Sequence, residues 1–114
     1  MITNAQSGTN IAEIAAGIFR INTPAKLPRE VGFSFNQYLI VDDAPMLFHT
    51  GQRKLFPLVS EAINAVLPVE RLKYLALSHF EADECGALNE LLAAAPNAVP
   101  VCGQIAALVA INDF

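Results

Sequence analysis

The spacing of apolar residues along the chain changes several times, and each change predicts a different element. Residues 33–41 are rich in aromatic and β-branched side chains, and Met46–His49 is a second apolar run of strand character. The segment between them, Asp42-Asp43-Ala44-Pro45, has the composition of a turn. These three segments together predict a β-hairpin.

The segments before this hairpin give weaker signals. Residues 1–10 are polar and contain glycine, which favours a loose or extended start. Ala12–Ala16 favours a helix, whereas Gly17–Ile21 alternates as a strand does, and we predict a strand only for the second segment. Pro24 and Pro28 then predict a loop.

Beyond the hairpin, the apolar period becomes that of a helix. Apolar side chains in residues 54–67 recur three or four positions apart and form one face, and Pro68 ends this segment. The further elements expected are a strand at Leu72–Leu77, a helix at Ala87–Ala95, a short strand at Ala98–Cys102 and a last helix at Gly103–Ala110. Strands connected by helices predict an α/β fold, in which a mixed sheet combines the hairpin with parallel strands.

The segment between the predicted strand at 72–77 and the following helix carries the candidate chemistry. His79, Glu81 and Asp83 stand at alternating positions directly after the apolar run. A buried strand holds the backbone in place, so the loop after it can direct three side chains toward one point. An imidazole nitrogen combined with carboxylate oxygens suits iron, manganese or zinc better than copper(I). We therefore predict that His79, Glu81 and Asp83 bind a metal; the alternative is a structural histidine beside solvated carboxylates.

The composition argues against some functions. The chain has 114 residues, of which 54% are hydrophobic and 16% are charged, which is apolar for one small domain. Either the core is dense, or another chain or a missing part of the same chain covers an apolar face. A net charge of −4 argues against nucleic-acid binding, and no apolar stretch of membrane-spanning length or signal peptide is seen. We therefore expect a cytoplasmic protein.

The two cysteines, Cys85 and Cys102, do not make a disulfide framework and are expected to stay reduced in the cytoplasm. Cys85 lies inside the motif and could be a ligand or a redox thiol. The alternative is a small buried residue beside a helix start, and we favour this second interpretation.

The order of the elements and the motif resemble the start of a metallo-β-lactamase-fold domain. The resemblance rests on Phe35–Asp42 and Leu47–Gly51 of the hairpin, then a helix, then a strand that runs into Ser78-His79-Phe80-Glu81-Ala82-Asp83. Hydrolases of that superfamily carry His-x-His-x-Asp-His. The pattern in this chain, His-x-Glu-x-Asp, resembles the flavodiiron-like branch, which reduces oxygen at a diiron site. The resemblance implies the N-terminal half of an αββα sandwich, with His79 and Glu81 on one iron and Asp83 on the other.

Two departures from the family pattern affect this interpretation. His49 stands where the superfamily often has Asp in an Asp-Thr-Gly turn; it either supports the metal site or is a polar residue at a strand end, and we favour the latter. The family domain is also longer, and its later half supplies further histidines and a bridging aspartate. We therefore expect residues 1–114 to be a truncated single domain that binds metal, has no flavin and is not catalytic on its own.

The resemblance thus implies a di-iron-binding domain related to oxygen- or nitric-oxide-reducing oxidoreductases. One alternative is a metal-dependent hydrolase of the same fold with zinc or manganese, although Glu81 in place of a histidine argues against it. Another alternative is a non-catalytic metal-binding or interaction module. Half of a sandwich would leave an apolar sheet face uncovered, so we expect a homo-oligomer in which a second copy covers that face.

Overall fold

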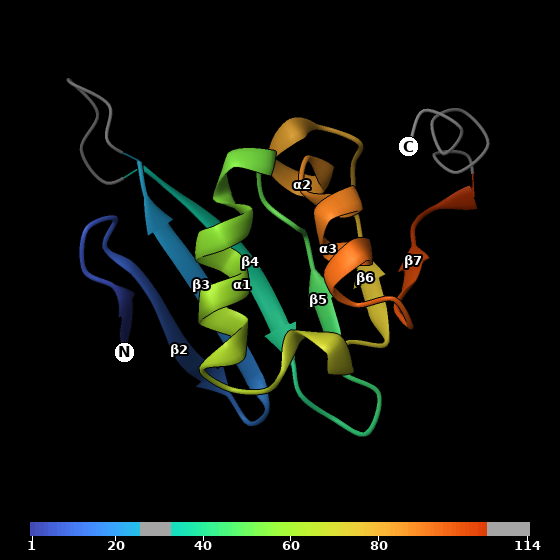
Figure 1. The fold of residues 1–114 in the computed structure, drawn as a ribbon, viewed down its shortest axis with the longest axis horizontal. Coiled ribbons are helices and arrows are strands. Elements are labelled where there is room, and N and C mark those ends of the chain that lie inside the picture. Colours follow the sequence, from blue (N-terminus) through green and yellow to red (C-terminus); the bar gives the residue numbers. More distant parts are fainter. Residues whose placement is uncertain (26–32, 105–114) are drawn as a thin grey trace.

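Seven strands form one mixed sheet in the computed structural model, which describes residues 1–25 and 33–104 (Figure 1). The strands are β1 Ile2–Asn4, β2 Thr9–Ala15, β3 Ile18–Pro24, β4 Ser34–Ile40, β5 Met46–Phe48, β6 Tyr74–Ala76 and β7 Val99–Val101. They occur in the sheet in the order in which they occur in the chain. Neighbours from β1 to β5 pair antiparallel, whereas β6 pairs parallel with both β5 and β7. The sheet thus joins an antiparallel meander to a parallel part.

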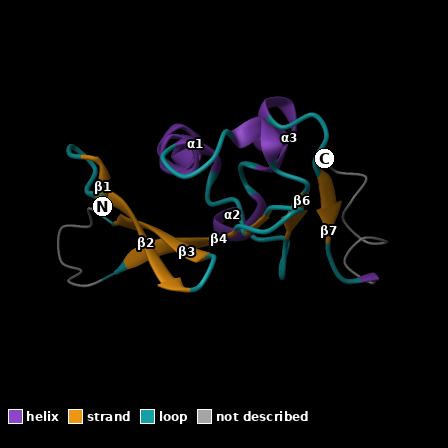
Figure 2. Ribbon diagram, turned by 90° about the horizontal axis from the view of Figure 1, so that it is seen from below, coloured by secondary structure: helices purple, strands orange, loops and turns teal. Residues whose placement is uncertain are grey.

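Two helices, α1 (Phe56–Asn64) and α3 (Leu88–Ala94), connect the parallel strands and lie on the same face of the sheet (Figures 1 and 2). The 3₁₀ turn η1 (Arg53–Leu55) precedes α1, which has a proline in its first turn, where no backbone donor is lost. A second 3₁₀ turn, η2 (Val69–Arg71), leads to β6, and a short helix, α2 (Ala82–Cys85), precedes α3. Among the helices of residues 1–25 and 33–104, none is long and apolar enough to cross a bilayer.

The core lies between the sheet and these two helices. Leu39, Leu47 and Leu75 occupy one register row across β4, β5 and β6, and each is 0% exposed. The helices contribute further buried aliphatic side chains to this core, Val59 and Ile63 from α1 and Leu88 and Leu91 from α3. Burying a leucine side chain contributes about 1.5–3 kcal/mol. This packing fixes the parallel strands, and therefore also the loops that follow their ends.

In the part of the chain that the structure describes, both helices leave the opposite face of the sheet open (Figure 2). One register row on this face is apolar and consists of Ile18, Ile40, Met46, Tyr74 and Val99. Nearer the other end of the strands, the side-chain amides of Asn10, Asn22 and Asn36 form a hydrogen-bonded row. Tyr74 and Val99 are 40% and 53% exposed. The open face is therefore apolar at one end and polar at the other.

The predicted α/β fold is confirmed, because the hairpin is β4–β5, two of the three predicted helices are α1 and α3, and the strands that they connect are parallel. The helix tendency of Ala12–Ala16 is misleading, since most of this segment belongs to β2. Its ladder with β3 and the burial of Ile11 outweigh the local helix propensity of its alanines. Pro24 ends β3 instead of starting a loop. Pro28 and, from residue 105 on, the expected last helix lie outside the described residues.

One fully buried side chain in the core has no hydrogen-bond partner. Gln37 on β4 is 0% exposed, and both its Oε1 and its Nε2 are unpaired. Gly51 lies against it, since a Cβ at that glycine would be 3.0 Å from Gln37 Nε2. Burying an amide without a partner costs about 1–3 kcal/mol on mutational scales. Gln37 is therefore expected to reduce the stability of the chain.

Candidate metal centre

The candidate site lies where the parallel strands β5 and β6 end. Open α/β sheets commonly bind ligands outside the carboxyl ends of their strands. β5 is followed by His49-Thr50-Gly51, and β6 by Leu77-Ser78-His79. The N–H of His49 donates to the carbonyl of Ala76 at 2.8 Å, so the contact between the two strands extends beyond the end of β5. The two loops therefore start side by side.

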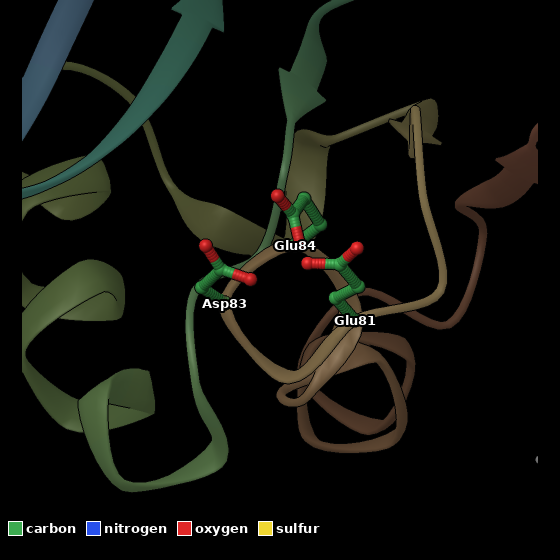
Figure 3. Close-up of side chains that lie close together, drawn as sticks. All are labelled: Glu81, Asp83 and Glu84. Carbon is green, nitrogen blue, oxygen red and sulfur yellow. The ribbon is translucent and has the colours of Figure 1, made fainter.

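Three carboxylates converge at the start of α2 (Figure 3). Glu81 is the N-cap of the helix, and Asp83 and Glu84 lie in its first turn. One oxygen of each lies within 4.8 Å of the others. Divalent cations bind oxygens at about 2.0–2.6 Å, so two oxygens on one ion can lie up to about 5 Å apart. The spacing and the hard donor set of this carboxylate cluster therefore fit a divalent cation such as ferrous iron.

Glu84 has a strongly shifted pKa. Its hydrogen bond with Asp83, its desolvation and the negative charges of Asp83 and Glu81 raise the pKa of Glu84 to about 7. The charge of His79 opposes this rise in pKa. The Oε2 atom of Glu84 is also buried without a hydrogen-bond partner. In the absence of a cation, Glu84 is therefore partly protonated close to neutral pH.

Only two of the three predicted ligands belong to the carboxylate cluster. Glu81 and Asp83 converge, whereas His79 is exposed and its ring is not among the converging groups. His79 still lies close enough for its charge to affect the pKa values of Glu84 and His49. Sequence reasoning missed Glu84. The available signal was its position directly after Asp83, where hydrolases of the superfamily carry a histidine.

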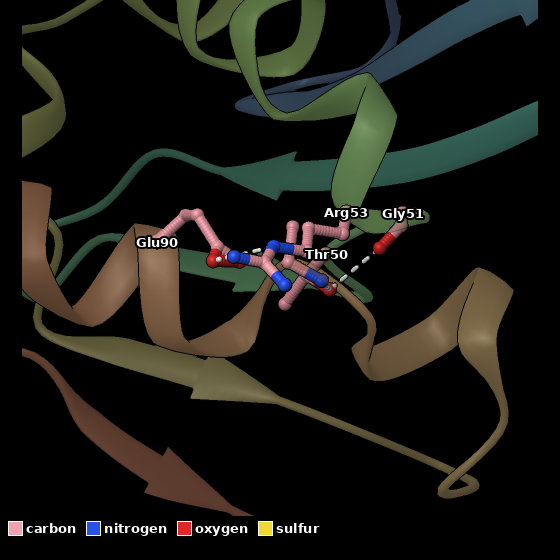
Figure 4. A network of polar contacts seen from close by, with 5 residues as sticks. Thr50, Gly51, Arg53 and Glu90 are labelled. Carbon is pink, nitrogen blue, oxygen red and sulfur yellow. Dashed lines mark hydrogen bonds and ion pairs between the residues drawn. The ribbon is translucent and has the colours of Figure 1, made fainter.

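Thr50 holds α2 in place from the neighbouring loop. Its N–H donates to the Glu84 carbonyl at 2.7 Å, and its hydroxyl lies 3.0 Å from the same oxygen. The hydroxyl also lies 2.9 Å from the Gly51 carbonyl (Figure 4) and accepts from the N–H of Ala87 at 3.2 Å. The N–H of Ala87 also donates to the Gly51 carbonyl at 3.1 Å. Because Thr50 is 0% exposed, water does not compete for these bonds.

The packing of α2 against η1 requires a glycine at position 86. A Cβ added to Gly86 would lie 2.5 Å from the Ala82 carbonyl oxygen and 2.9 Å from the Arg53 backbone nitrogen. Both are backbone atoms, which cannot rotate away as a side chain can. Arg53 also pairs with Glu90 of α3 at 3.5 Å (Figure 4), but its side chain is 82% exposed, and such ion pairs contribute little. The ion pair joins η1 to α3, whereas close backbone contact holds α2 against η1.

His49 lies beside the cluster with a left-handed backbone. Its φ is 67°, the one positive value among the described non-glycine residues. Its Nε2 lies 2.6 Å from Ser78 Oγ, and its ring stacks on Phe48 with centroids 4.3 Å apart. Desolvation lowers the pKa of His49, the charge of Asp83 raises it and the charge of His79 lowers it, with a net decrease. The imidazole is therefore neutral at neutral pH. Its contact, Ser78, immediately precedes His79 in the sequence.

Cys85 is not a member of this site. The side chain is 4% exposed and belongs to the hydrophobic core. Burial and the charges of Glu84 and Asp83 raise its pKa, so it stays a thiol and not the thiolate that binds metals. The prediction of a small buried residue at this position is confirmed.

The chain is similar to known proteins over most of its length. A family model described as ODP family beta lactamase matches residues 33–111, a range that includes the hairpin and the carboxylate cluster. The chain belongs to the ODP beta-lactamase family. It is 32% identical to the anaerobic nitric oxide reductase flavorubredoxin of Pectobacterium atrosepticum over 71 residues. These residues cover 62% of this chain and 14% of that relative. It is 29% identical to the putative diflavin flavoprotein A 2 of Nostoc sp. over 75 residues, and these residues cover 66% of this chain and 13% of the relative.

Solved flavodiiron structures share the fold of this ODP-family chain. Rubredoxin oxygen:oxidoreductase from Desulfovibrio gigas gives a TM-score of 0.80 at 21% identity, covering 92% of this chain and 29% of that one. The Flv1 flavodiiron core from Synechocystis sp. gives 0.73 at 25% identity, covering 88% and 27%. A metallo-beta-lactamase from Cronobacter sakazakii gives 0.70 at 18% identity, covering 86% and 35%. The predicted metallo-β-lactamase fold and the resemblance to flavodiiron proteins are thus confirmed, and the chain spans only a small part of the relatives' length.

Proposed function

We propose that this ODP-family chain binds iron as part of an oxidoreductase that reduces nitric oxide or dioxygen. The observation that carries the proposal is the convergence of Glu81, Asp83 and Glu84 within 4.8 Å. Carboxylate oxygens favour hard cations, and the addition of an imidazole suits iron. The relatives support the reaction type, since one is named a nitric oxide reductase and a structural neighbour is named a rubredoxin oxygen:oxidoreductase.

Each residue has a definite role in this proposal. Glu81, Asp83 and Glu84 would supply oxygens, and the exposed His79 would supply an imidazole nitrogen. The family resemblance implies His79 and Glu81 on one iron and Asp83 on the other. Water or further protein groups complete the coordination. When bound, iron supplies the redox chemistry of the reduction, while Thr50 and Gly86 hold the helix that carries the ligands.

Two other functions would leave different signatures. A metal-dependent hydrolase of the same fold would bind zinc or manganese and cleave an ester or a lactam. Glu81 argues against a hydrolase function, because the hydrolases carry a histidine at that position of the motif. A non-catalytic interaction module would bind no stoichiometric metal.

Native mass spectrometry with elemental analysis tests the proposal. Protein stripped with a chelator is loaded anaerobically with Fe²⁺, and bound iron is counted for the parent, Glu81→Gln and Asp83→Asn. Glu70→Gln is the matched control, because Glu70 is exposed in η2 and lies outside the cluster. We expect iron on the parent and the control, and its loss from both cluster variants. Equal iron on all four proteins, or none on the parent, would refute the proposal, and zinc with ester turnover would favour the hydrolase.

A further inference from the structure

We propose that His49 is a positioning residue: through Ser78 it fixes the loop that presents His79 and Glu81 to the metal. Its importance for metal binding rests on the proposed function, whereas the fixing of the loop can be measured without metal. The structure thus favours a supporting role for His49 over that of a polar residue that merely ends a strand.

The backbone of His49 directs one loop toward two different elements. At a φ of 67°, the N–H of His49 points to the Ala76 carbonyl, while the next N–H, of Thr50, points to the Glu84 carbonyl. The turn therefore joins the end of β6 to α2, and these are the two elements that flank the motif loop. Glycine makes a left-handed turn at lower cost than histidine does. The turn alone therefore does not explain why an imidazole stands here.

The side chain of His49 makes a third link to the motif. Its Nε2 lies 2.6 Å from Ser78 Oγ, which is short for a hydrogen bond between nitrogen and oxygen. Stacking on Phe48, with 28° between the two ring planes, sets the orientation of the imidazole. Because Ser78 immediately precedes His79, this bond limits where the His79 backbone can lie. Strained backbones that persist beside a site of charged groups are commonly part of how that site is held.

The electrostatic surroundings of His49 suit this role. The groups whose charges act on its imidazole are Asp83 and His79, so the ring lies within electrostatic reach of two predicted ligands. Its lowered pKa keeps the ring neutral at neutral pH. A neutral ring adds no positive charge beside a bound cation, and it can still hydrogen-bond Ser78.

Three single variants and one double variant separate a positioning role from a structural one. His49→Gly removes the imidazole and relieves the left-handed backbone, so its thermal midpoint should stay the same or rise. Its affinity for Co²⁺, a spectroscopic probe of the centre, should nevertheless fall at least about tenfold, because residues that orient metal ligands typically change affinity by about 10–100-fold. Ser78→Ala should cause a similar loss, and the double variant no more than either single one, because both remove one interaction. His49→Gln, whose amide can reach Ser78, should retain most of the affinity.

A second measurement needs no metal. Backbone ¹⁵N order parameters of residues 78–81 should be about 0.85 in the parent and below about 0.6 in His49→Gly and Ser78→Ala. Order parameters that stay at the parent value in both variants would overturn the proposal, and so would parent-like Co²⁺ affinity in both. If the parent binds neither Co²⁺ nor Fe²⁺, the proposed metal function fails, and the order parameters alone decide whether His49 fixes the loop.

Discussion

Replacing Thr50 with valine tests whether this buried threonine positions α2. Valine keeps the shape of the side chain and removes the hydroxyl, which lies 3.0 Å from the Glu84 carbonyl and 3.2 Å from the Ala87 nitrogen. Neither partner is left unpaired, because the Glu84 carbonyl keeps the Thr50 N–H at 2.7 Å and the Ala87 N–H keeps the Gly51 carbonyl at 3.1 Å. Each lost hydrogen bond costs about 1 kcal/mol, and no orphaned group adds its desolvation penalty. We therefore expect the free energy of unfolding to fall by about 1–2 kcal/mol.

Urea unfolding of the metal-free protein, followed by circular dichroism, measures this loss. Thr50→Ser is the matched control, because it keeps the hydroxyl and removes one methyl group, worth about 0.8 kcal/mol. The two variants should therefore be similarly stable, but only Thr50→Val should loosen α2, speed amide exchange at Ala87 and weaken Co²⁺ binding. A loss above about 3 kcal/mol in Thr50→Val would show that the backbone partners do not replace the hydroxyl. Equal exchange and equal metal affinity in both variants would refute the positioning of α2 by the hydroxyl.

Four further changes test other parts of the structure. The folded pKa of Glu84, about 7, lies above its ordinary value of 4.5, so the folded metal-free chain binds more protons between these values. Its stability should therefore fall as the pH rises through that window, and Glu84→Gln should remove this slope in urea unfolding. Gln37→Met should raise the free energy of unfolding by about 1–3 kcal/mol, because it removes a buried amide without partners; a decrease would show that buried water satisfies the amide. Gly86→Ala should lower the free energy of unfolding by about 1–3 kcal/mol, the usual cost of overpacking, because the new Cβ would lie 2.5 Å from the Ala82 carbonyl oxygen. Unchanged urea unfolding would contradict this contact. A second copy should cover the open sheet face, so sedimentation equilibrium should detect dimers that Met46→Glu, in the apolar row, dissociates; a monomeric parent at micromolar concentration would count against this.

The parts of the fold that could be predicted from the sequence are those with local signals. A polar turn between two apolar runs identifies the β4–β5 hairpin, and an apolar face at helical spacing identifies α1. β2 depends on contacts that are distant in sequence, because Ile11 is buried and Ala12 pairs with Arg20 of β3. The local preference of Ala12–Ala16 for a helix contains no information about that partner, which decides the structure.

In the candidate site, too, the features with local signals could be predicted, and those that depend on distant contacts could not. Glu81 and Asp83 lie in the segment that follows an apolar strand, and this order was enough to place both near one point. We predicted a loop from Ser78 up to the helix expected at Ala87, but the chain turns into α2 at Ala82. The first turn of that helix brings Glu84, and not His79, into the cluster. The contact of Thr50 with Glu84 joins residues 34 positions apart, and no local spacing predicts it.

The repulsion within the carboxylate cluster connects the fold to the proposed function. Glu81, Asp83 and Glu84 carry like charges, and a proton on Glu84, whose pKa is about 7, removes only one of them. A divalent cation would offset more of this repulsion, and it must displace the proton on Glu84 in order to bind there. Bound metal should therefore stabilise the folded chain more above about pH 7 than below it, which is opposite to the trend of the metal-free protein. If metal stabilised the chain equally on both sides of that pH, the bound ion would have to lie outside the carboxylate cluster.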